Sequence, residues 1–293
     1  PVLIDSPLPN RTYRGKVRDT YDLGDRLLIV ATDRISAYDA VLSTGIPDKG
    51  KVLSQMSAWW FDRTKAVVPN HFIRLADGTP ADDLPFALPP ELVGRSTIAR
   101  KARRVDVECI VRGYISGSAW AEYSEYGTVN GVRMDKGLLE SQQLPEPMFT
   151  PTTKAEEGHD EPMTFSDLIE EVGPEPAQGL RLRSIALYNY AAAYALERGI
   201  IIADTKFEFG YIDGELHVID EILTPDSSRF WDVADYKAGG PQQSFDKQYV
   251  RDWLSQSGWD RQPPAPPLPG DVVAGTSARY AEAYLRLTGL EVR

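Results

Sequence analysis

Three charged side chains alternate with a hydroxyl group and aromatic rings in one apolar segment of the chain. The charged residues are Asp204, Lys206 and Glu208, and those between and after them are Thr205, Phe207 and Phe209. Successive side chains of a β-strand point to opposite faces, so a strand here would gather the charges on one face and the rings on the other. Two carboxylates near an ammonium group suit a divalent metal beside a phosphate, because hard cations prefer oxygen ligands.

The same segment continues through a turn at Asp213-Gly214 and returns to Asp220. A two-residue turn would pair Phe207 with Asp220 and place Asp220 on the aromatic face. A three-residue loop followed by a bulge would pair Lys206 with Asp220 and bring it to the charged face. We expect the bulged register.

A turn near the start of the chain combines glycine with two cations. Gly15 allows the backbone to come close to a phosphate, and Lys16 and Arg18 alternate onto one strand face. The pattern is not that of a strand-to-helix phosphate loop. Taken alone, it favours an exposed strand with solvated charges.

Residues 32–39 follow an apolar strand and contain two aspartates, an arginine and two hydroxyl residues, and they end at Asp39. Such a segment could be a substrate loop at the mouth of a sheet, because binding residues often lie on loops. It could equally be a turn in which Asp and Ser side chains cap a helix.

Charged residues also interrupt a strand that is otherwise built for burial. Glu108 and Arg112 share one face of it, where charge is costly unless it is paired or liganded. An ion pair between the two would explain them without a ligand. Ser118 follows with a hydroxyl group suited to phosphate. Arg229 stands beside two serines and suits bidentate recognition of phosphate or carboxylate, although a turn capped by Asp226 is the alternative.

The elements that must position these residues fall into two parts. We expect a β-hairpin at 12–31, a helix at 49–66, a short strand at 71–75 and two strands around a bend at 104–106. Further helices are expected at 118–126, 178–198, 246–256 and 276–288, and residues 127–163 form a long connection. The pattern predicts a β-rich lobe over 1–110 and a larger α+β lobe over 111–293.

The bulk composition limits the possible functions. The chain has 293 residues, a net charge of −11, 42% hydrophobic residues and 26% charged residues, which is ordinary for a globular protein of two lobes. Its acidity argues against general binding to nucleic acid or anionic membranes. One cysteine and three scattered histidines argue against a disulfide or a zinc cluster. We find no apolar run of membrane length and no signal pattern near residue 1, and therefore expect a cytoplasmic protein.

Six segments, in order, resemble the SAICAR synthetase family of purine biosynthesis in its larger, yeast-like form. They are YRGKVRDTYDLG, TDRISAYD, VECIVRGYISGSAW, FTPTTKAEEGHDEP, ADTKFEFG and DEILTPDSSRFWD. The resemblance covers residues 11 to about 250. It implies a two-lobed fold similar to ATP-grasp enzymes and protein kinases, with antiparallel sheets and ATP in the cleft between the lobes. It also implies a reaction in which ATP, L-aspartate and carboxyaminoimidazole ribonucleotide (CAIR) give SAICAR, ADP and phosphate.

The resemblance assigns a role to each candidate residue. Those expected to bind ATP are Gly15, Lys16 and Arg18 at the phosphates and Arg104, Val105 and Val107 at the adenine. The expected Mg²⁺ ligands are Glu208 and Asp220, with Glu108 as a nearby third carboxylate. Those expected to hold CAIR are Arg112, Ser118 and Arg229, with Asp39 and Asp160 orienting CAIR or the amine. Lys206 would neutralise the transferring phosphoryl group, and Asp204 is a candidate proton acceptor. Arg18 stands where some relatives carry lysine.

Two other functions remain possible from the sequence. A small-molecule kinase would stop after phosphoryl transfer, and a nucleotide sensor would lack chemistry, although its expected loss of the lysine or a metal carboxylate is not seen here. The expected partners are small molecules, with no nucleic acid and no membrane. The oligomeric state is open, with a monomer slightly favoured.

Overall fold

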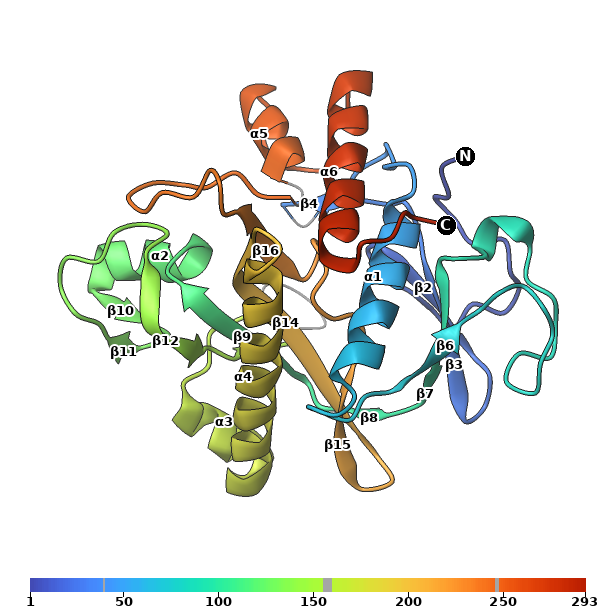
Figure 1. Cartoon of the computed structure of the whole chain (residues 1–293), viewed down its shortest axis with the longest axis horizontal. Helices are drawn as coiled ribbons and strands as arrows, with labels where there is room; N and C mark the ends of the chain where they lie inside the picture. Colours follow the sequence, from blue (N-terminus) through green and yellow to red (C-terminus); the bar gives the residue numbers. More distant parts are fainter. Residues whose placement is uncertain (39, 155–159, 246–247) are drawn as a thin grey trace.

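Two main antiparallel sheets, with helices packed against them, form the two lobes of an α+β fold (Figure 1). The computed structural model describes residues 1–38, 40–154, 160–245 and 248–293. The predicted fold class is therefore correct. None of the helices in these ranges is long and apolar enough to cross a membrane.

The first sheet has five strands in the order β1-β2-β3-β7-β6. They are β1 (Tyr13–Arg14), β2 (Arg18–Asp22), β3 (Arg26–Ala31), β6 (Phe72–Leu75) and β7 (Ser96–Arg100). Strands β2 and β3 form the predicted hairpin. Leu28, Val30 and Ile98 from this sheet are buried in a small core of its own, to which Leu92 of the 3-10 helix η1 (Pro90–Leu92) also belongs.

The second sheet is built around one long strand, β14 (Ile200–Ile212). Its other strands are β8 (Arg103–Arg104), β9 (Val107–Tyr114), β12 (Gln143–Phe149), β13 (Thr152–Thr153), β15 (Glu215–Ile219) and β16 (Ser228–Asp232). Two small hairpins lie outside both sheets, β4 (Ser36–Ala37) with β5 (Ala40–Val41) and β10 (Thr128–Val129) with β11 (Val132–Arg133). Phe207 and Phe209 are fully buried in the main core, so the predicted aromatic face of β14 is confirmed.

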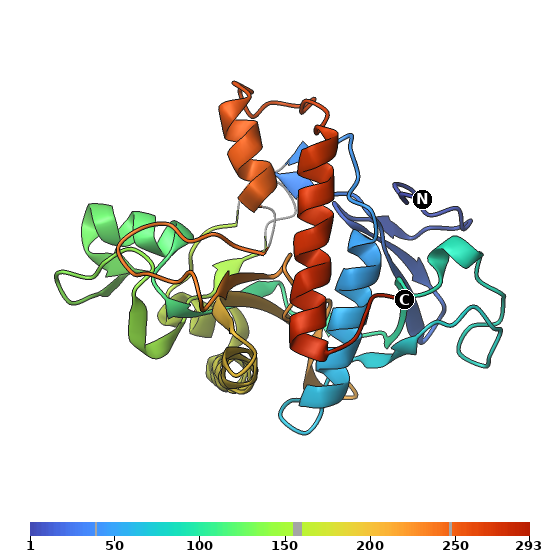
Figure 2. The ribbon, with the colours of Figure 1, turned by 45° about the horizontal axis from the view of Figure 1, so that its top comes forward.

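Six α-helices occur in the described ranges. They are α1 (Lys49–Thr64), α2 (Gly117–Tyr126), α3 (Phe165–Val172), α4 (Pro174–Leu196), α5 (Gln248–Gln256) and α6 (Gly270–Thr288). Helix α4 packs on β14 from the side opposite the charged face, and α1 and α6 lie side by side in both views (Figures 1 and 2). The predicted apolar stripe of α1 is buried at Leu53, Met56, Trp60 and Phe61.

The hairpin of β14 and β15 does not have the bulged register that we expected. Glu208 pairs with Ile219, and this regular ladder contains no bulge on the way to the turn. The same register, continued by one residue, sets Phe207 opposite Asp220. The prediction was wrong because it assumed that only a bulge could bring Asp220 to the charged face.

Left-handed backbone at three residues achieves the same result without a bulge. Asp213 and Gly214 in the turn have φ values of 52° and 80°, as a tight hairpin turn of type I′ requires. Asp220 lies just beyond β15 and has a φ of 67°. The chain therefore leaves the ladder at Asp220, and its carboxylate turns into the space between the sheets, where Arg18 meets it.

Several other elements differ from the sequence predictions. The connection at 127–163 contains the short strands β10 to β13, and helix α3 was not predicted, although Thr164 and Asp167 form a capping box at its start. Helices α4 and α6 begin earlier than expected, at Pro174 and Gly270. The division at residue 110 stays a prediction, and that residue lies within β9.

Candidate active site

A cavity of about 520 Å³ opens between the two sheets. One wall is the loop between β1 and β2 with strand β3, and the other is formed by β9, β14 and the segment after β15. Its charged lining residues are Lys16, Arg18, Arg100, Arg104, Glu108, Lys154, Asp160, Lys206, Glu208, Asp220, Glu221 and Asp226. The predicted phosphate-binding cations and the predicted metal carboxylates therefore share one cavity.

Asp204 lies between two arginines on neighbouring strands. Strand β16 places Arg229 beside it, and β9 places Arg112 on the other side. Arg229 forms an ion pair with the Asp204 carboxylate, and Nη1 of Arg112 lies 3.5 Å from its Oδ2. Nη2 of Arg112 also donates to Oγ of Ser118 at 3.2 Å. Arg112, Ser118 and Arg229 are thus brought together around Asp204.

Gly117 allows this cluster to be tight. Its φ is +58°, and a Cβ built there would lie 2.3 Å from Nη2 of Arg229. A side chain at this position would both strain the backbone and displace the guanidinium group. The absence of a side chain at Gly117 therefore leaves the space that the Arg229 guanidinium group occupies.

Lys206 is surrounded by carboxylates. Its Nζ lies 2.5 Å from Oε1 of Glu108 and 3.6 Å from Oε1 of Glu208. Burial alone would lower the pKa of Lys206, but these two carboxylates outweigh it and raise that pKa. Burial also raises the pKa of Glu108, which Lys206 only partly offsets. Glu108 therefore pairs with Lys206 and not with Arg112, which was the alternative without a ligand.

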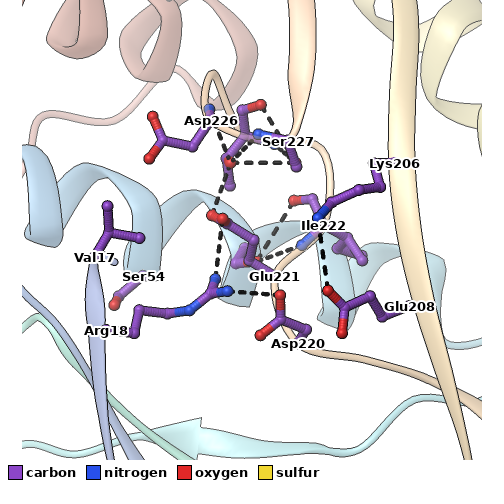
Figure 3. Close-up of polar contacts among 12 residues, drawn as sticks. Val17, Arg18, Ser54, Lys206, Glu208, Asp220, Glu221, Ile222, Asp226 and Ser227 are labelled. Carbon is purple, nitrogen blue, oxygen red and sulfur yellow. Dashed lines mark hydrogen bonds and ion pairs between the residues drawn. The ribbon is translucent and has the colours of Figure 1, made fainter. Parts of the chain in front are cut away.

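Arg18 holds two consecutive carboxylates across the cavity (Figure 3). Its Nη2 lies 2.6 Å from Oδ2 of Asp220, and its Nη1 lies 3.0 Å from Oε1 of Glu221. Burial would raise the pKa of Asp220, but the charge of Arg18 outweighs it and lowers that pKa. Burial raises the pKa of Glu221, and Arg18 offsets this only partly. The two lobes are therefore joined electrostatically at Arg18.

The donor set fits Mg²⁺ only if phosphate completes it. Within the described ranges, no three carboxylate, imidazole or thiolate groups converge as a metal-binding group. Glu208 and Asp220 nevertheless face the same cavity, and Mg²⁺ is usually held by one or two carboxylates together with substrate phosphates. Cations stand beside these carboxylates, with Lys154 at Glu208 and Arg18 at Asp220.

The loop with Gly15 and Lys16 is held by a buried arginine. Arg34 is 2% exposed and donates to the carbonyls of Gly15 and Lys16 at 3.0 and 3.1 Å. It also pairs with Asp19, with a shortest separation of 2.8 Å. The segment 32–39 was considered as a substrate loop or a capping turn, yet its arginine serves to shape the glycine loop. Asp39 itself lies outside the described residues.

The predicted adenine hinge lies at the edge of the cavity. Arg104 lines it, whereas the side chains of Val105 and Val107 are buried in the main core. The N–H of Val105 donates to the carbonyl of Phe209 at 2.9 Å. Any contact of Val105 or Val107 with a nucleotide would therefore have to use the backbone.

Several residues of the cavity were missed by the sequence analysis. Lys154 pairs with Glu208, and Glu221 pairs with Arg18. Asp226, noted only as a possible cap, lines the cavity and pairs with Lys49 of α1 at 2.6 Å. Lys154 belongs to the same family-like segment as Asp160, so its charge was a visible signal. Nothing in the sequence pointed to Lys49.

A second cavity of about 520 Å³ adjoins this cluster. Its lining comes from α2, from the hairpin of β10 and β11 and from segments beside β9, and it includes Arg112 and Ser118. Glu122 shapes one side by accepting hydrogen bonds from the N–H groups of Asn130 and Gly131 at 2.8 and 3.0 Å.

Known proteins resemble this chain over nearly its whole length. The family model of SAICAR synthetase matches residues 11–266. A protein of Thermodesulfovibrio yellowstonii named phosphoribosylaminoimidazole-succinocarboxamide synthase is 52% identical, covering 94% of both chains. One of the same name from Desulfosudis oleivorans is 53% identical, covering 97% of both chains.

Solved structures agree with these relatives. SAICAR synthase from Saccharomyces cerevisiae, solved in complex with SAICAR, is 43% identical with a TM-score of 0.88, covering 99% of this chain and 98% of that one. A SAICAR synthetase solved in complex with ADP has a TM-score of 0.71 at 22% identity, covering 96% of this chain and 99% of that one, and it shows the shared fold alone. On the extent of these matches, the chain belongs to the SAICAR synthetase family.

Proposed function

We propose that this protein joins L-aspartate to CAIR at the expense of ATP, giving SAICAR, ADP and phosphate. The observation that carries the proposal is the charged face of β14. It runs from Glu208 past Lys206 to Asp204, and Arg112 and Arg229 flank its far end. A substrate with a carboxylate at one end and a phosphate at the other can lie along such a face. The names of the relatives supply the identity of that substrate.

ATP lies with its phosphates under the loop of Gly15 and Lys16. Glycine permits close backbone approach, Arg34 holds the loop carbonyls, and Lys16 and Arg18 supply positive charge. The adenine reaches the bend between β8 and β9, where Arg104 lies at the edge and the backbone of Val105 and Val107 provides polar groups. The ADP complex of a relative supports nucleotide binding to this fold.

The carboxylate of CAIR cannot be attacked by an amine until one of its oxygens becomes a leaving group. In the proposed mechanism that oxygen attacks the γ-phosphorus of ATP, and ADP leaves, so an acyl phosphate forms. The aspartate amine then attacks the acyl carbon, the C–N bond forms, and phosphate leaves with the former carboxylate oxygen. Positioning and cations around the phosphates contribute most to such transfers, and Lys206 is placed to neutralise the transferring group.

Mg²⁺ is part of the proposal, with Glu208 and Asp220 as ligands and Glu108 as a third nearby carboxylate. When bound, it would neutralise charge on the phosphates. Lys154 and Arg18 stand beside two of these carboxylates, and with a metal bound there their charges would be available to phosphate.

The far end of the face binds the phosphoribosyl part of CAIR. Arg229 and Arg112 offer guanidinium groups and Ser118 a hydroxyl group, a combination suited to phosphate. Asp160 lines the cavity and is exposed, so it can orient CAIR or the amine. Asp204 takes the proton that the amine loses, or phosphate does. A rate near wild type for Asp204→Asn would rule out Asp204.

The reaction is proposed to take place in the cytoplasm. The three small substrates require no macromolecular partner.

The experiment that tests this proposal is product analysis with the purified protein. Incubation with ATP, Mg²⁺, CAIR and L-aspartate should give SAICAR, and omission of any one substrate should prevent it. ADP released equally fast with CAIR alone would favour the kinase alternative. A protein that binds ATP and releases no ADP under any of these conditions would be a nucleotide sensor.

A further inference from the structure

A buried charge cluster lies behind the active-site cavity. Nζ of Lys49 in α1 lies 2.6 Å from Oδ2 of Asp226, and the hydroxyl group of Tyr280 in α6 donates to Oδ1 at 2.5 Å. Lys49 and Tyr280 are both 0% exposed, and Lys49 also lies 5.7 Å from the centre of the Tyr280 ring. Helices from opposite ends of the chain therefore meet at one carboxylate.

Asp226 lies in the loop between β15 and β16, between a proposed metal ligand and a proposed substrate-binding arginine. This loop begins with the proposed metal ligand Asp220 and leads, three residues after Asp226, to Arg229. The backbone N–H of Asp226 donates to Oγ1 of Thr224 at 3.3 Å, which makes the turn before β16 compact. Only Ser227 and Ser228 lie between Asp226 and Arg229 in the chain.

The first half of the loop has anchors of its own. The N–H of Ile222 donates to Oγ of Ser57 at 2.8 Å, and Nε2 of His71 donates to the carbonyl of Asp220 at 3.2 Å. Burial lowers the pKa of His71 to about 4, so its ring is neutral near pH 7 and keeps this role. Asp220 can therefore hold its place independently of Tyr280.

A buried ion pair is weak evidence for stability, because desolvation of both charges offsets their attraction. The contacts of Lys49 and Tyr280 with Asp226 are better explained by their effect on geometry, because two helices fix the Asp226 side chain from two directions. We propose that Tyr280 and Lys49 are positioning residues, which hold Asp226 so that Arg229 lies against Asp204 and Gly117, ready for the phosphate end of CAIR. The inference rests on the proposed function and extends it to α6, an element that contributes none of the lining residues of the cavity.

The inference predicts a selective defect. Tyr280→Phe keeps the ring in the core and removes one hydrogen bond to a charged group, which is enough to change binding by about tenfold. The KM for CAIR should rise by about that factor, while the KM for ATP should stay within about twofold because its loop is anchored by Arg34. The kcat should fall less than the KM rises.

Tyr284→Phe is the matched control. Tyr284 lies one turn further along α6, is 4% exposed and contacts the main core. Its variant also loses one buried hydroxyl group, so any general loosening of α6 affects both proteins alike. The control should keep the wild-type KM for CAIR, and thermal unfolding of both variants shows whether each is folded.

A double-mutant cycle tests whether Tyr280 acts through Arg229. Arg229→Lys alone should raise the KM for CAIR, and adding Tyr280→Phe to it should raise the KM by less than about twofold more, because coupled residues are not additive. Full tenfold additivity, an equal rise for ATP, an unchanged KM for CAIR in Tyr280→Phe, or the same defect in Tyr284→Phe would each overturn the inference. A wild-type protein that forms no SAICAR would overturn the proposed function instead, and with it the basis of the inference.

Discussion

The proposed metal ligands Glu208 and Asp220 each lie beside a cation, and this pairing bears on what their substitution does. Glu208 has Lys154 and Lys206 nearby, and Asp220 has Arg18. Removing one carboxylate therefore removes a proposed metal ligand and also releases a cation. The consequence for turnover should be large, whereas the consequence for folding should be small, because the released cations can reach solvent in the cavity.

We predict that Glu208→Gln and Asp220→Asn lower kcat by at least about 10³-fold. Each removes a proposed Mg²⁺ ligand, and phosphoryl transfer depends on cations held around the phosphates. Asp213→Asn is the control. Asp213 lies on the same hairpin, its side chain is 86% exposed, and asparagine tolerates its left-handed backbone. Steady-state kinetics and circular dichroism check the series, and a Glu208→Gln variant with more than a tenth of wild-type activity would contradict the metal role.

Arg229→Ala should act on one substrate only. It removes a guanidinium group from the proposed phosphate site, so the KM for CAIR should rise by about 10²-fold, as expected for a charge-assisted contact. Arg103→Ala, which removes an exposed arginine stacked on Tyr211 outside the cavity lining, is the control. An unchanged KM for CAIR in Arg229→Ala would count against the assignment.

Site residues could be found from the sequence where the residues that act together are close in sequence. Asp204, Lys206 and Glu208 were found because a period of two in one strand puts them on one face. Pairing between distant segments left no such signal. Lys49 lies far in sequence from Asp226, so their ion pair depends on how α1 packs against the loop between β15 and β16 and could not be read from either segment.

At the level of elements, the turn of the β14–β15 hairpin could be predicted from local sequence, but the direction of Asp220 could not. The turn at Asp213-Gly214 was correctly located, and its residues are those a type I′ turn favours. The direction of Asp220 was explained wrongly, because a left-handed aspartate just beyond a strand leaves no pattern in the alternation of polar and apolar residues. Arg18, on the other sheet, provides the opposing charge at that position.

Gly214→Ala should test the turn. Its φ of +80° is strained for any residue with a Cβ, while no atom lies within 4 Å of the position where that Cβ would be. We expect a loss of about 1 kcal/mol in the free energy of unfolding, from backbone strain alone. Urea denaturation measures it. Stability equal to wild type would mean that the turn has another conformation in solution.

Strand β9 has a charged face toward the cavity and an apolar face toward the main core, and Cys109 lies on the apolar face. Cys109 is 0% exposed and belongs to the main core, next to Glu108 on the cavity side. Burial raises the pKa of its thiol, so it stays protonated and shielded. A thiol reagent at pH 8 should find no reactive group in the folded protein and one after denaturation. Rapid reaction of the folded protein would contradict this register.

At the level of the whole molecule, the proposed active site lies in the cavity between the two sheets. The glycine loop belongs to one sheet and the charged face of β14 to the other, and Arg18 bridges them through Asp220 and Glu221. The fold class and most helices were predictable because periodicity and turn residues are local. The meeting of α1 and α6 behind the cavity was not predictable, since it depends on contacts between the two ends of the chain.

The central claim is that an oxygen of the CAIR carboxylate becomes the leaving group by accepting phosphate from ATP. CAIR with ¹⁸O in that carboxylate tests it most directly. Each turnover with ATP and L-aspartate should transfer one labelled oxygen to the inorganic phosphate and leave the other in the new amide of SAICAR, and mass spectrometry of the phosphate detects the label. Phosphate free of ¹⁸O, with SAICAR still formed, would contradict the account.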